Sequence, residues 1–221
     1  MKIIEPQFKI ISPANDAAAI NALQFIELAA RISHRSEDAQ TPDSWRRFLN
    51  AVVIGHGDYS VIEHASASVL FRVDRGITHE LVRHRLFSYT QESTRFVNGR
   101  KSYPDGLQFI EPIDLPAGFP AVRFHSSCSA AEEAYLSLLD AKVRPQEARA
   151  VLPNALASTI AMTGNFRSWR HFFLMRTTRE SHPDMRRVAV PLLAAFKERI
   201  PLLYDDVEPD ARQIDNLKKA K

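Results

Sequence analysis

The sequence is poor in cysteine and glycine. It has one cysteine, Cys128, and seven glycines in 221 residues. A single cysteine excludes an intrachain disulfide and an all-cysteine metal site, and a reducing cytoplasm is then the simplest expected location. No Gly-x-Gly-x-x-Gly or Walker motif is present, so no glycine-rich backbone cradle for phosphate is expected. A phosphorylated ligand would have to be held by side chains.

Long apolar runs are also missing. No stretch is long enough to cross a bilayer, and residues 1–6 lack the apolar region of a signal peptide. The content of 45% hydrophobic and 25% charged residues is ordinary for a globular protein. We predict a single domain of mixed α and β type over residues 1–221, with a polar tail from about residue 208.

What the sequence does contain is a dense cluster of hydrogen-bond donors at residues 83–95. These residues are Arg-His-Arg-Leu-Phe-Ser-Tyr-Thr-Gln-Glu-Ser-Thr-Arg, and they follow an apolar lead-in at residues 77–82. Donors at this density are costly to bury unless anions or acceptors meet them. We therefore predict a site for a negatively charged ligand, and arginine favours a phosphorylated small molecule.

A nucleic-acid-binding module is the alternative. It is suggested by the isoelectric point of about 9.1 and by the interleaving of arginines with aromatic residues. It predicts an affinity that falls steeply with salt, and no bound chromophore. The net charge of only +3 does not by itself indicate a nucleic acid.

The residue pattern predicts a series of helices and strands. Strands are expected at residues 7–12, 66–73 and 156–163. Helices are expected at residues 15–32, 43–54, 76–83, 122–142, 146–152, 165–178 and 183–200. Asn15 is a predicted N-cap. Residues 97–120 are predicted to be irregular, either as a binding loop or lid or as a solvated connector.

Metal and thiol chemistry are both poorly supported. His79 and His84 stand five positions apart, about 140° around a helix, whereas a zinc-protease helix needs four. We predict no metal site. Cys128 lies in a helix-like context without a nearby base, so a cysteine nucleophile is not expected.

Several sequence blocks resemble those of the flavin-dependent thymidylate synthases. Arg83-His84-Arg85, then seven residues, then Ser93 is the signature of that family. Further blocks follow in the family's order at residues 60–64, 74–82, 91–96, 148–153 and 165–172. Five blocks in register over residues 56–200 make the resemblance specific.

The resemblance implies a fold and a reaction. The implied fold is α+β, with helices packed on a curved, mainly antiparallel sheet. The implied assembly is a cytoplasmic homotetramer with active sites at subunit interfaces, and with no nucleic-acid or membrane partner. The implied reaction, in dTMP biosynthesis, converts dUMP to dTMP. 5,10-Methylenetetrahydrofolate supplies the carbon, and FAD reduced by NADPH supplies the hydride.

The resemblance also implies site residues. The implied FAD-binding residues are Ser60, Arg83, His84, Arg85, Gln91, Asn165, Phe166, Arg167 and His171. The implied dUMP-binding residues are Glu80, Leu81, Val82, Arg83, Gln91, Glu92, Ser93, Thr94, Arg95, Arg149 and Arg176. Arg176 matches the catalytic arginine that promotes ionisation of uracil N3. Since arginine stays protonated, it would act by electrostatic stabilisation rather than as a base.

Some assignments leave alternatives. Ser93 is either a nucleophile, which requires a neighbouring base, or a hydrogen-bond donor to the nucleotide, which we favour. Glu63 and His64 either have a function or close a turn. Arg167 and His171 share a helical face, which suits a ligand or an ordinary exposed stripe.

The chain also departs from the family pattern. Asp58, Glu80 and His171 stand where relatives often have histidine, glutamine and asparagine. Trp169, Phe172 and Phe173 are expected in the core rather than against the flavin. A catalytically inactive scaffold is a third hypothesis, and the presence of Gln91, Ser93, Arg95, Arg149 and Arg176 argues against it.

Overall fold

The computed structural model describes residues 1–97 and 99–209, so nearly all of the predicted polar tail lies outside the described residues. The chain forms two compact units. The first unit comprises Met1–Gln7, Phe71–Arg83 and Tyr89–Ala161. The second unit comprises Phe8–Leu70, His84–Ser88 and the chain from Met162 onward. The single-domain organisation stays a prediction.

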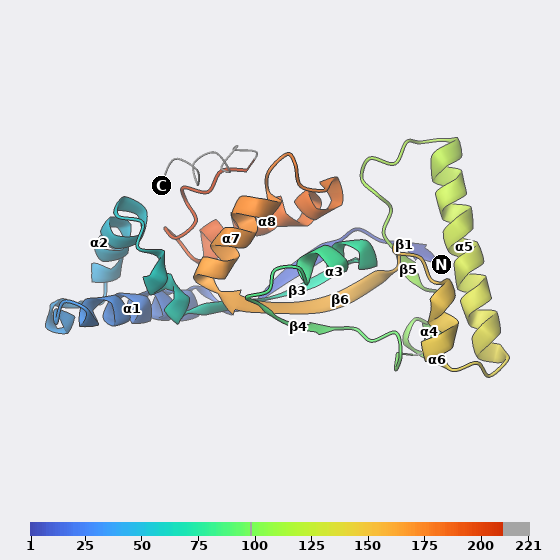
Figure 1. The fold of residues 1–221 in the computed structure, drawn as a ribbon, viewed down its shortest axis with the longest axis horizontal. Coiled ribbons are helices and arrows are strands. Elements are labelled where there is room, and N and C mark those ends of the chain that lie inside the picture. Colours follow the sequence, from blue (N-terminus) through green and yellow to red (C-terminus); the bar gives the residue numbers. More distant parts are fainter. Residues whose placement is uncertain (98, 210–221) are drawn as a thin grey trace. The chain divides into compact units, whose positions relative to one another are not determined.

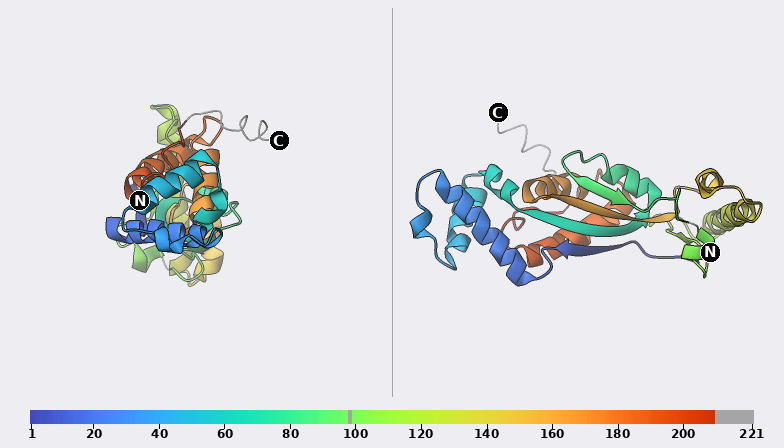
Figure 2. Two further views of the ribbon diagram at one scale, coloured as in Figure 1. Left: turned by 90° about the vertical axis from the view of Figure 1, so that its left-hand side faces the viewer. Right: turned by 90° about the horizontal axis from the view of Figure 1, so that it is seen from below.

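A four-stranded sheet has the order β2 (Gln7–Ser12), β3 (Ser66–Asp74), β6 (Ala157–Asn165) and β4 (Ser88–Gln91). The ribbons of β3 and β6 lie side by side (Figures 1 and 2). The Ser68 and Thr163 hydroxyls lie 2.8 Å apart, and Arg72 donates to Thr159 Oγ1 at 2.9 Å. From Ser68 to Arg72 the residue number on β3 rises by four, while the number of the partner on β6 falls by four, from Thr163 to Thr159. The two strands are therefore antiparallel. This confirms the α+β class, while the sheet curvature stays a prediction.

Alternation in β3 explains which face of the strand is buried. Ala67, Val69, Phe71 and Val73 are buried, and the residues between them are more exposed. This period of two is the pattern of a half-buried strand, and it confirms the strand predicted at 66–73. The strand predicted at 156–163 is β6.

In the first unit, the N-cap Asp74 accepts from Ile77 N at 3.0 Å and begins α3 (Arg75–Leu81). The prediction that this helix would carry Arg83 is wrong, because Val82 is the C-cap and Arg83 N donates to Glu80 O in a tight last turn. Next come α4 (Gly99–Ser102), α5 (Phe119–Asp140), α6 (Pro145–Ala148) and the 3₁₀ turn η4 (Arg149–Val151). The short strands β1 (Lys2–Ile3) and β5 (Gln108–Phe109) pair in parallel.

The core of the first unit forms where α5 packs on the short elements. Leu107, Phe109, Cys128, Tyr135 and Leu156 are among its buried residues. The prediction that residues 97–120 are irregular is partly wrong, because α4, β5 and the first residues of α5 lie within this range. Leu107 and Phe109 are buried in the core of the unit, which orders the chain around β5. Its role as a lid or as a connector stays a prediction.

The second unit is mainly helical. Its helices are α1 (Asp16–Ile32), α2 (Ser44–Leu49), α7 (Phe166–Arg176) and α8 (Pro183–Arg199). Between them lie the short helices η1 (Glu37–Ala39), η2 (Asn50–Gly55) and η3 (Tyr59–His64). The Asn15 side chain accepts from Ala18 N at 2.9 Å, which confirms the predicted N-cap.

An aromatic cluster fills the core of the second unit. The Trp169 ring lies 5.4 Å from Phe172 and 5.1 Å from Phe196, measured between centroids. Phe173 and Tyr204 complete the cluster, and all five side chains are buried. Ring pairs at these distances add to the stabilisation from buried area. The prediction that Trp169, Phe172 and Phe173 are core residues is confirmed.

Among the described residues, no helix combines the length and the apolar character needed to cross a membrane.

Candidate active site

The predicted dUMP residues fall mostly in the first unit. These are Glu80, Leu81, Val82, Arg83, Gln91, Glu92, Ser93, Thr94, Arg95 and Arg149. The second unit contains Arg176 and the predicted FAD residues other than Arg83 and Gln91. The first unit therefore contains most of the predicted dUMP residues, and the second unit contains most of the predicted FAD residues.

In the first unit, Gln91 is fixed at the end of β4. Its Nε2 donates to Thr78 Oγ1 at 3.0 Å and to Ser158 Oγ at 3.1 Å. Thr78 lies on α3 and Ser158 on β6, so a helix and a strand together orient the amide. Both amide hydrogens are then used inside the unit, and the carbonyl oxygen is the group that Gln91 can offer as an acceptor.

A tight turn follows at Ser93. Ser93 O accepts from Val97 N at 2.9 Å and from Phe96 N at 3.3 Å, and Ser93 Oγ accepts from Arg95 N at 3.3 Å. Among the contacts within residues 1–97 and 99–209, none provides a base for the Ser93 hydroxyl. A nucleophile needs such a base, so this geometry favours the binding role.

Two arginines are exposed near this turn. Arg149 Nη1 donates to Thr94 Oγ1 at 3.0 Å, and Arg95 lies over the Phe96 ring at 5.3 Å from its centroid. Both residues are exposed. Exposed guanidinium groups remain hydrated and can exchange water for a phosphate without the cost of burying an unpaired charge.

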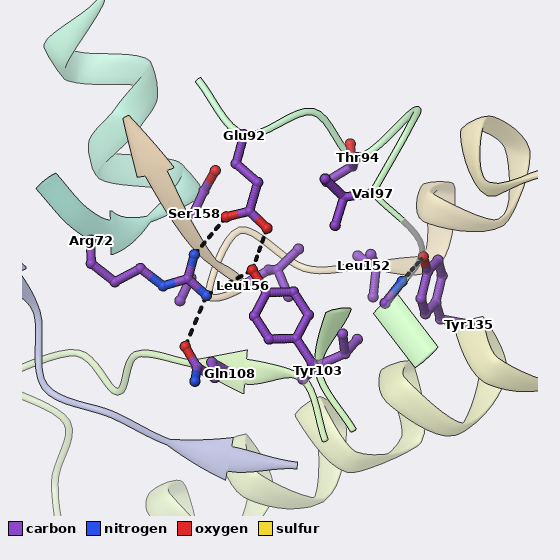
Figure 3. Close-up of a pocket in the computed structure, with 13 residues that line it drawn as sticks. Arg72, Glu92, Thr94, Val97, Tyr103, Gln108, Tyr135, Leu152, Leu156 and Ser158 are labelled. Atoms are coloured by element: carbon purple, nitrogen blue, oxygen red, sulfur yellow. Dashed lines mark hydrogen bonds and ion pairs between the residues drawn. The ribbon is translucent and has the colours of Figure 1, made fainter. Parts of the chain in front are cut away.

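The sequence did not identify three residues of the network around Glu92, namely Arg72, Tyr103 and Gln108. Arg72 and Tyr103 bond to Glu92, and Gln108 bonds to Arg72. Arg72 Nη1 lies 2.6 Å from Glu92 Oε2, and Tyr103 OH donates to Glu92 Oε1 (Figure 3). Arg72 Nη2 donates to Gln108 Oε1 at 2.9 Å. Arg72 follows a strand alternation that predicts a surface residue, and its partners lie 20 to 87 positions away. No local pattern therefore identifies this network.

These side chains line a small hollow that is partly open to solvent. Its lining also includes Thr94, Val97 and Ser158 (Figure 3). The hollow therefore lies directly beside the predicted dUMP-binding segment.

In the second unit, His84 and Arg176 form a pair. Arg176 Nε donates to His84 Nε2 at 2.9 Å, so Nε2 is the acceptor and the ring proton is on Nδ1. Burial, the Arg176 charge and His171 together lower the pKa of His84 to about 4. His84 is therefore neutral at neutral pH, and it orients the Arg176 side chain.

Aromatic contacts hold the His84 segment in place. The His84 ring lies 5.1 Å from Phe172 and 6.3 Å from Phe87. Phe87 packs edge-on against Trp169 at 4.9 Å and lies over Gly164, where an added Cβ would come within 2.4 Å of the Phe87 ring. Gly164 is therefore required for the close approach of this segment to β6.

Three other predicted FAD residues, Asn165, Phe166 and Arg167, lie at the start of α7. The Asn165 side chain caps α7 by accepting from Ser168 N at 2.8 Å. Phe166 is fully buried, so its side chain supports the core. Arg167 Nη1 donates to Glu63 Oε1 at 2.6 Å. Glu63, whose role the sequence left undecided, thus forms an ion pair with a predicted FAD residue. The residues Ser60, Arg85, Arg167 and His171 are exposed.

Cys128 has the properties of a structural residue. It is buried on α5 among the core residues of the first unit. Burial raises the pKa of its thiol to about 11, so it is almost wholly protonated near neutral pH and is a poor nucleophile.

Comparison with known protein families gives one match over most of the chain. The family model described as "Thymidylate synthase complementing protein" matches residues 17–202. The chain belongs to this family. The residues of both groups described above lie within the matched range.

Curated relatives carry the name flavin-dependent thymidylate synthase. The protein from Corynebacterium efficiens is 36% identical over 89% of this chain and 84% of its own length. The protein from Mycobacterium tuberculosis is 35% identical over 83% of this chain and 78% of its own length. The chain is an enzyme of the flavin-dependent thymidylate synthase type.

A solved structure shares the fold. The crystal structure of PolB, a UMP/dUMP methylase from Streptomyces cacaoi bound with 5-Br dUMP, matches with a TM-score of 0.74. It is 24% identical, and the match covers 93% of this chain and 96% of PolB. The same methylase bound with 5-Br UMP matches with a TM-score of 0.71.

Proposed function

We propose that this enzyme converts dUMP to dTMP for dTMP biosynthesis, with 5,10-methylenetetrahydrofolate as the carbon donor and NADPH as the reductant of a bound FAD. The observation that carries the proposal is the arrangement at the end of β4. There, an oriented Gln91 amide, the Ser93 turn and the exposed Arg95 and Arg149 occur together within one compact unit.

The residues of the first unit suit a nucleoside monophosphate. The Arg95 and Arg149 guanidinium groups present forked donors of the kind that bind phosphate oxygens. The Gln91 carbonyl oxygen accepts from a base edge, and the Ser93 hydroxyl donates to the nucleotide. The remaining residues of the proposed dUMP set, which include Glu80, Leu81, Val82 and Arg83, support or flank these groups.

Arg176 is the proposed catalytic residue. Its guanidinium stabilises negative charge on uracil N3 and on the adjacent carbonyl oxygen, which makes C5 more nucleophilic. Because Arg176 Nε is held by neutral His84, the orientation of the terminal nitrogens is restricted. This activation needs no covalent bond to the enzyme, in agreement with the buried and protonated Cys128.

The exposed donors on the second unit fit a flavin dinucleotide. The cationic Arg85 and Arg167 suit its pyrophosphate, and Ser60 and His171 are exposed polar groups of the same unit. We propose that these residues, with Arg83, His84, Gln91, Asn165 and Phe166, form the FAD set, although Phe166 contributes through its position in the core. The bound flavin supplies the hydride chemistry, and the protein supplies binding and orientation.

We also propose a cytoplasmic homotetramer with active sites at subunit interfaces, on the basis of the resemblance. Light scattering of the purified protein measures the mass of the assembly in solution. A mass four times that of the chain agrees with the proposal, and a monomer contradicts it.

The visible spectrum of the purified protein tests the function. We expect flavin absorbance close to one FAD per chain, and bleaching by NADPH under anaerobic conditions when dUMP is present. UMP is the matched control ligand, because it differs from dUMP by one hydroxyl group. A colourless protein that binds no added FAD would contradict the proposal, and salt-sensitive binding of oligonucleotides in its place would support the nucleic-acid alternative.

A further inference from the structure

A network of charged and polar groups behind the proposed dUMP-binding segment has no role assigned so far. Arg72 on β3, Tyr103 after α4 and Gln108 on β5 lie outside the predicted site residues. Through Glu92 they contact the middle of the segment 91–95 (Figure 3). We call Arg72, Glu92, Tyr103 and Gln108 the Arg72 network.

We propose that Arg72 is a positioning residue that acts through Glu92 to hold residues 91–95 in the conformation that binds dUMP. This inference rests on the proposed function and deepens it. It assigns Glu92 an internal contact in place of a direct contact with the nucleotide, and it adds Arg72, Tyr103 and Gln108 to the residues that determine affinity for dUMP.

The guanidinium geometry supports a positioning role. Arg72 Nη1 bonds to Glu92 Oε2 at 2.6 Å and to Thr159 Oγ1 at 2.9 Å. Arg72 Nη2 bonds to Tyr103 OH at 3.1 Å and to Gln108 Oε1 at 2.9 Å. Four acceptors around one planar group define its position in a way that the single ammonium of lysine cannot reproduce.

Burial makes the Arg72–Glu92 pair sensitive to change. The two side chains are only 16% and 18% exposed. Removing one partner leaves the other charge poorly solvated, which costs more than the loss of an exposed pair. Burial and the bond to Glu92 raise the pKa of Tyr103, so the phenol keeps its proton and remains a donor to the carboxylate.

The contacts of Glu92 also fix the positions of its neighbours in the sequence. Its backbone N donates to Thr159 O at 2.8 Å, and its side chain accepts from Thr159 N at 3.1 Å. The residue is thereby tied to both backbone groups of one position on β6. Gln91 and Ser93 are its direct neighbours, so a shift of Glu92 displaces the amide and the turn proposed to bind dUMP.

The segment also borders a small hollow that is partly open to solvent and is lined by Glu92 and Thr94. On this side the segment is not fully enclosed by packed side chains. Hydrogen bonds from the Arg72 network add to the packing that holds it in place.

The test measures dUMP affinity in FAD-loaded full-length protein by calorimetry, together with kcat and KM. We expect Glu92→Gln and Arg72→Lys to raise Kd and KM for dUMP by about tenfold, the effect of losing a hydrogen bond to a charged group. kcat should stay within about twofold. In the Arg72→Lys, Glu92→Gln double variant the losses should not multiply, because both changes remove one contact.

Asp140→Asn is the matched control. It also removes one carboxylate charge from an arginine pair of the first unit, but Asp140 and Arg100 are exposed. It should leave dUMP affinity unchanged. Tyr103→Phe provides a milder variant should Glu92→Gln fail to fold, and it should raise Kd by roughly two- to fivefold.

Three outcomes would overturn the inference. The variants could bind dUMP as tightly as the unmodified protein does. They could instead lose dUMP affinity, kcat, FAD and thermal stability in parallel, which indicates a general structural role. If the unmodified protein itself fails to bind dUMP, the proposed function falls and this inference falls with it, a result distinct from the first two.

Discussion

Replacing Gly164 with alanine tests the packing that holds the His84 segment in the second unit. The new Cβ would lie 2.4 Å from two carbons of the Phe87 ring and 3.1 Å from a third. Carbon atoms at van der Waals contact lie about 3.5 to 4.0 Å apart. The ring must therefore move by more than 1 Å or the strand must bend.

The expected cost combines two opposing effects. Overpacking a well-filled site costs about 1 to 3 kcal/mol. Replacing a strand glycine with alanine returns about 0.5 to 1 kcal/mol. We expect a net loss of about 0.5 to 2 kcal/mol in the free energy of unfolding, or roughly 1 to 8 °C in Tm for a chain of this size.

The assay is urea unfolding combined with FAD titration. Because Phe87 contacts both Trp169 and His84, a displaced ring should also weaken FAD binding. Gly55→Ala is the control, since its added Cβ would meet only Asn50 O, at 3.6 Å. Phe87→Ala in the Gly164→Ala background should recover part of the loss caused by the clash. Unchanged stability and FAD affinity in Gly164→Ala would refute this reasoning.

The remaining predictions concern single residues. Arg176→Ala should leave folding and FAD content largely intact and abolish dTMP formation; normal turnover would contradict its assigned role. Ser93→Ala should weaken dUMP binding but retain some activity, whereas complete loss with dUMP still bound would favour a nucleophile. Cys128→Ala should keep full turnover per folded enzyme in a steady-state assay. The pKa of His84 is lowered from 6.5 to about 4 in the folded protein. As pH falls from 6.5 toward 4, His84 is therefore protonated in the unfolded state but stays neutral in the folded state. Unfolding free energy should therefore decline more steeply over that range than in His84→Gln, and equal slopes would contradict this assignment.

Local features of the fold were predictable from the sequence. Asn15 and Asn165 cap their helices because the side-chain acceptor and the backbone donor lie three residues apart. The strand at 66–73 follows from its alternation. Each of these signals is complete within a short window of sequence.

Features that depend on distant residues were not predictable. The strand β4 was missed because its four residues are polar and half-exposed, and they gain their structure by pairing with β6. Arg72 was missed because its partners come from four other segments of the chain. Phe166 matches the family pattern in the sequence, but its side chain is buried in the core. A match of residue type does not reveal the direction in which a side chain points.

The most direct measurement of the central claim is the product formed from dUMP, FAD, NADPH and methylenetetrahydrofolate labelled with deuterium in its methylene group. The proposed function predicts dTMP that carries the label in its methyl group, and no labelled product from Arg176→Ala. Absence of labelled dTMP from the unmodified, FAD-loaded enzyme would contradict the claim.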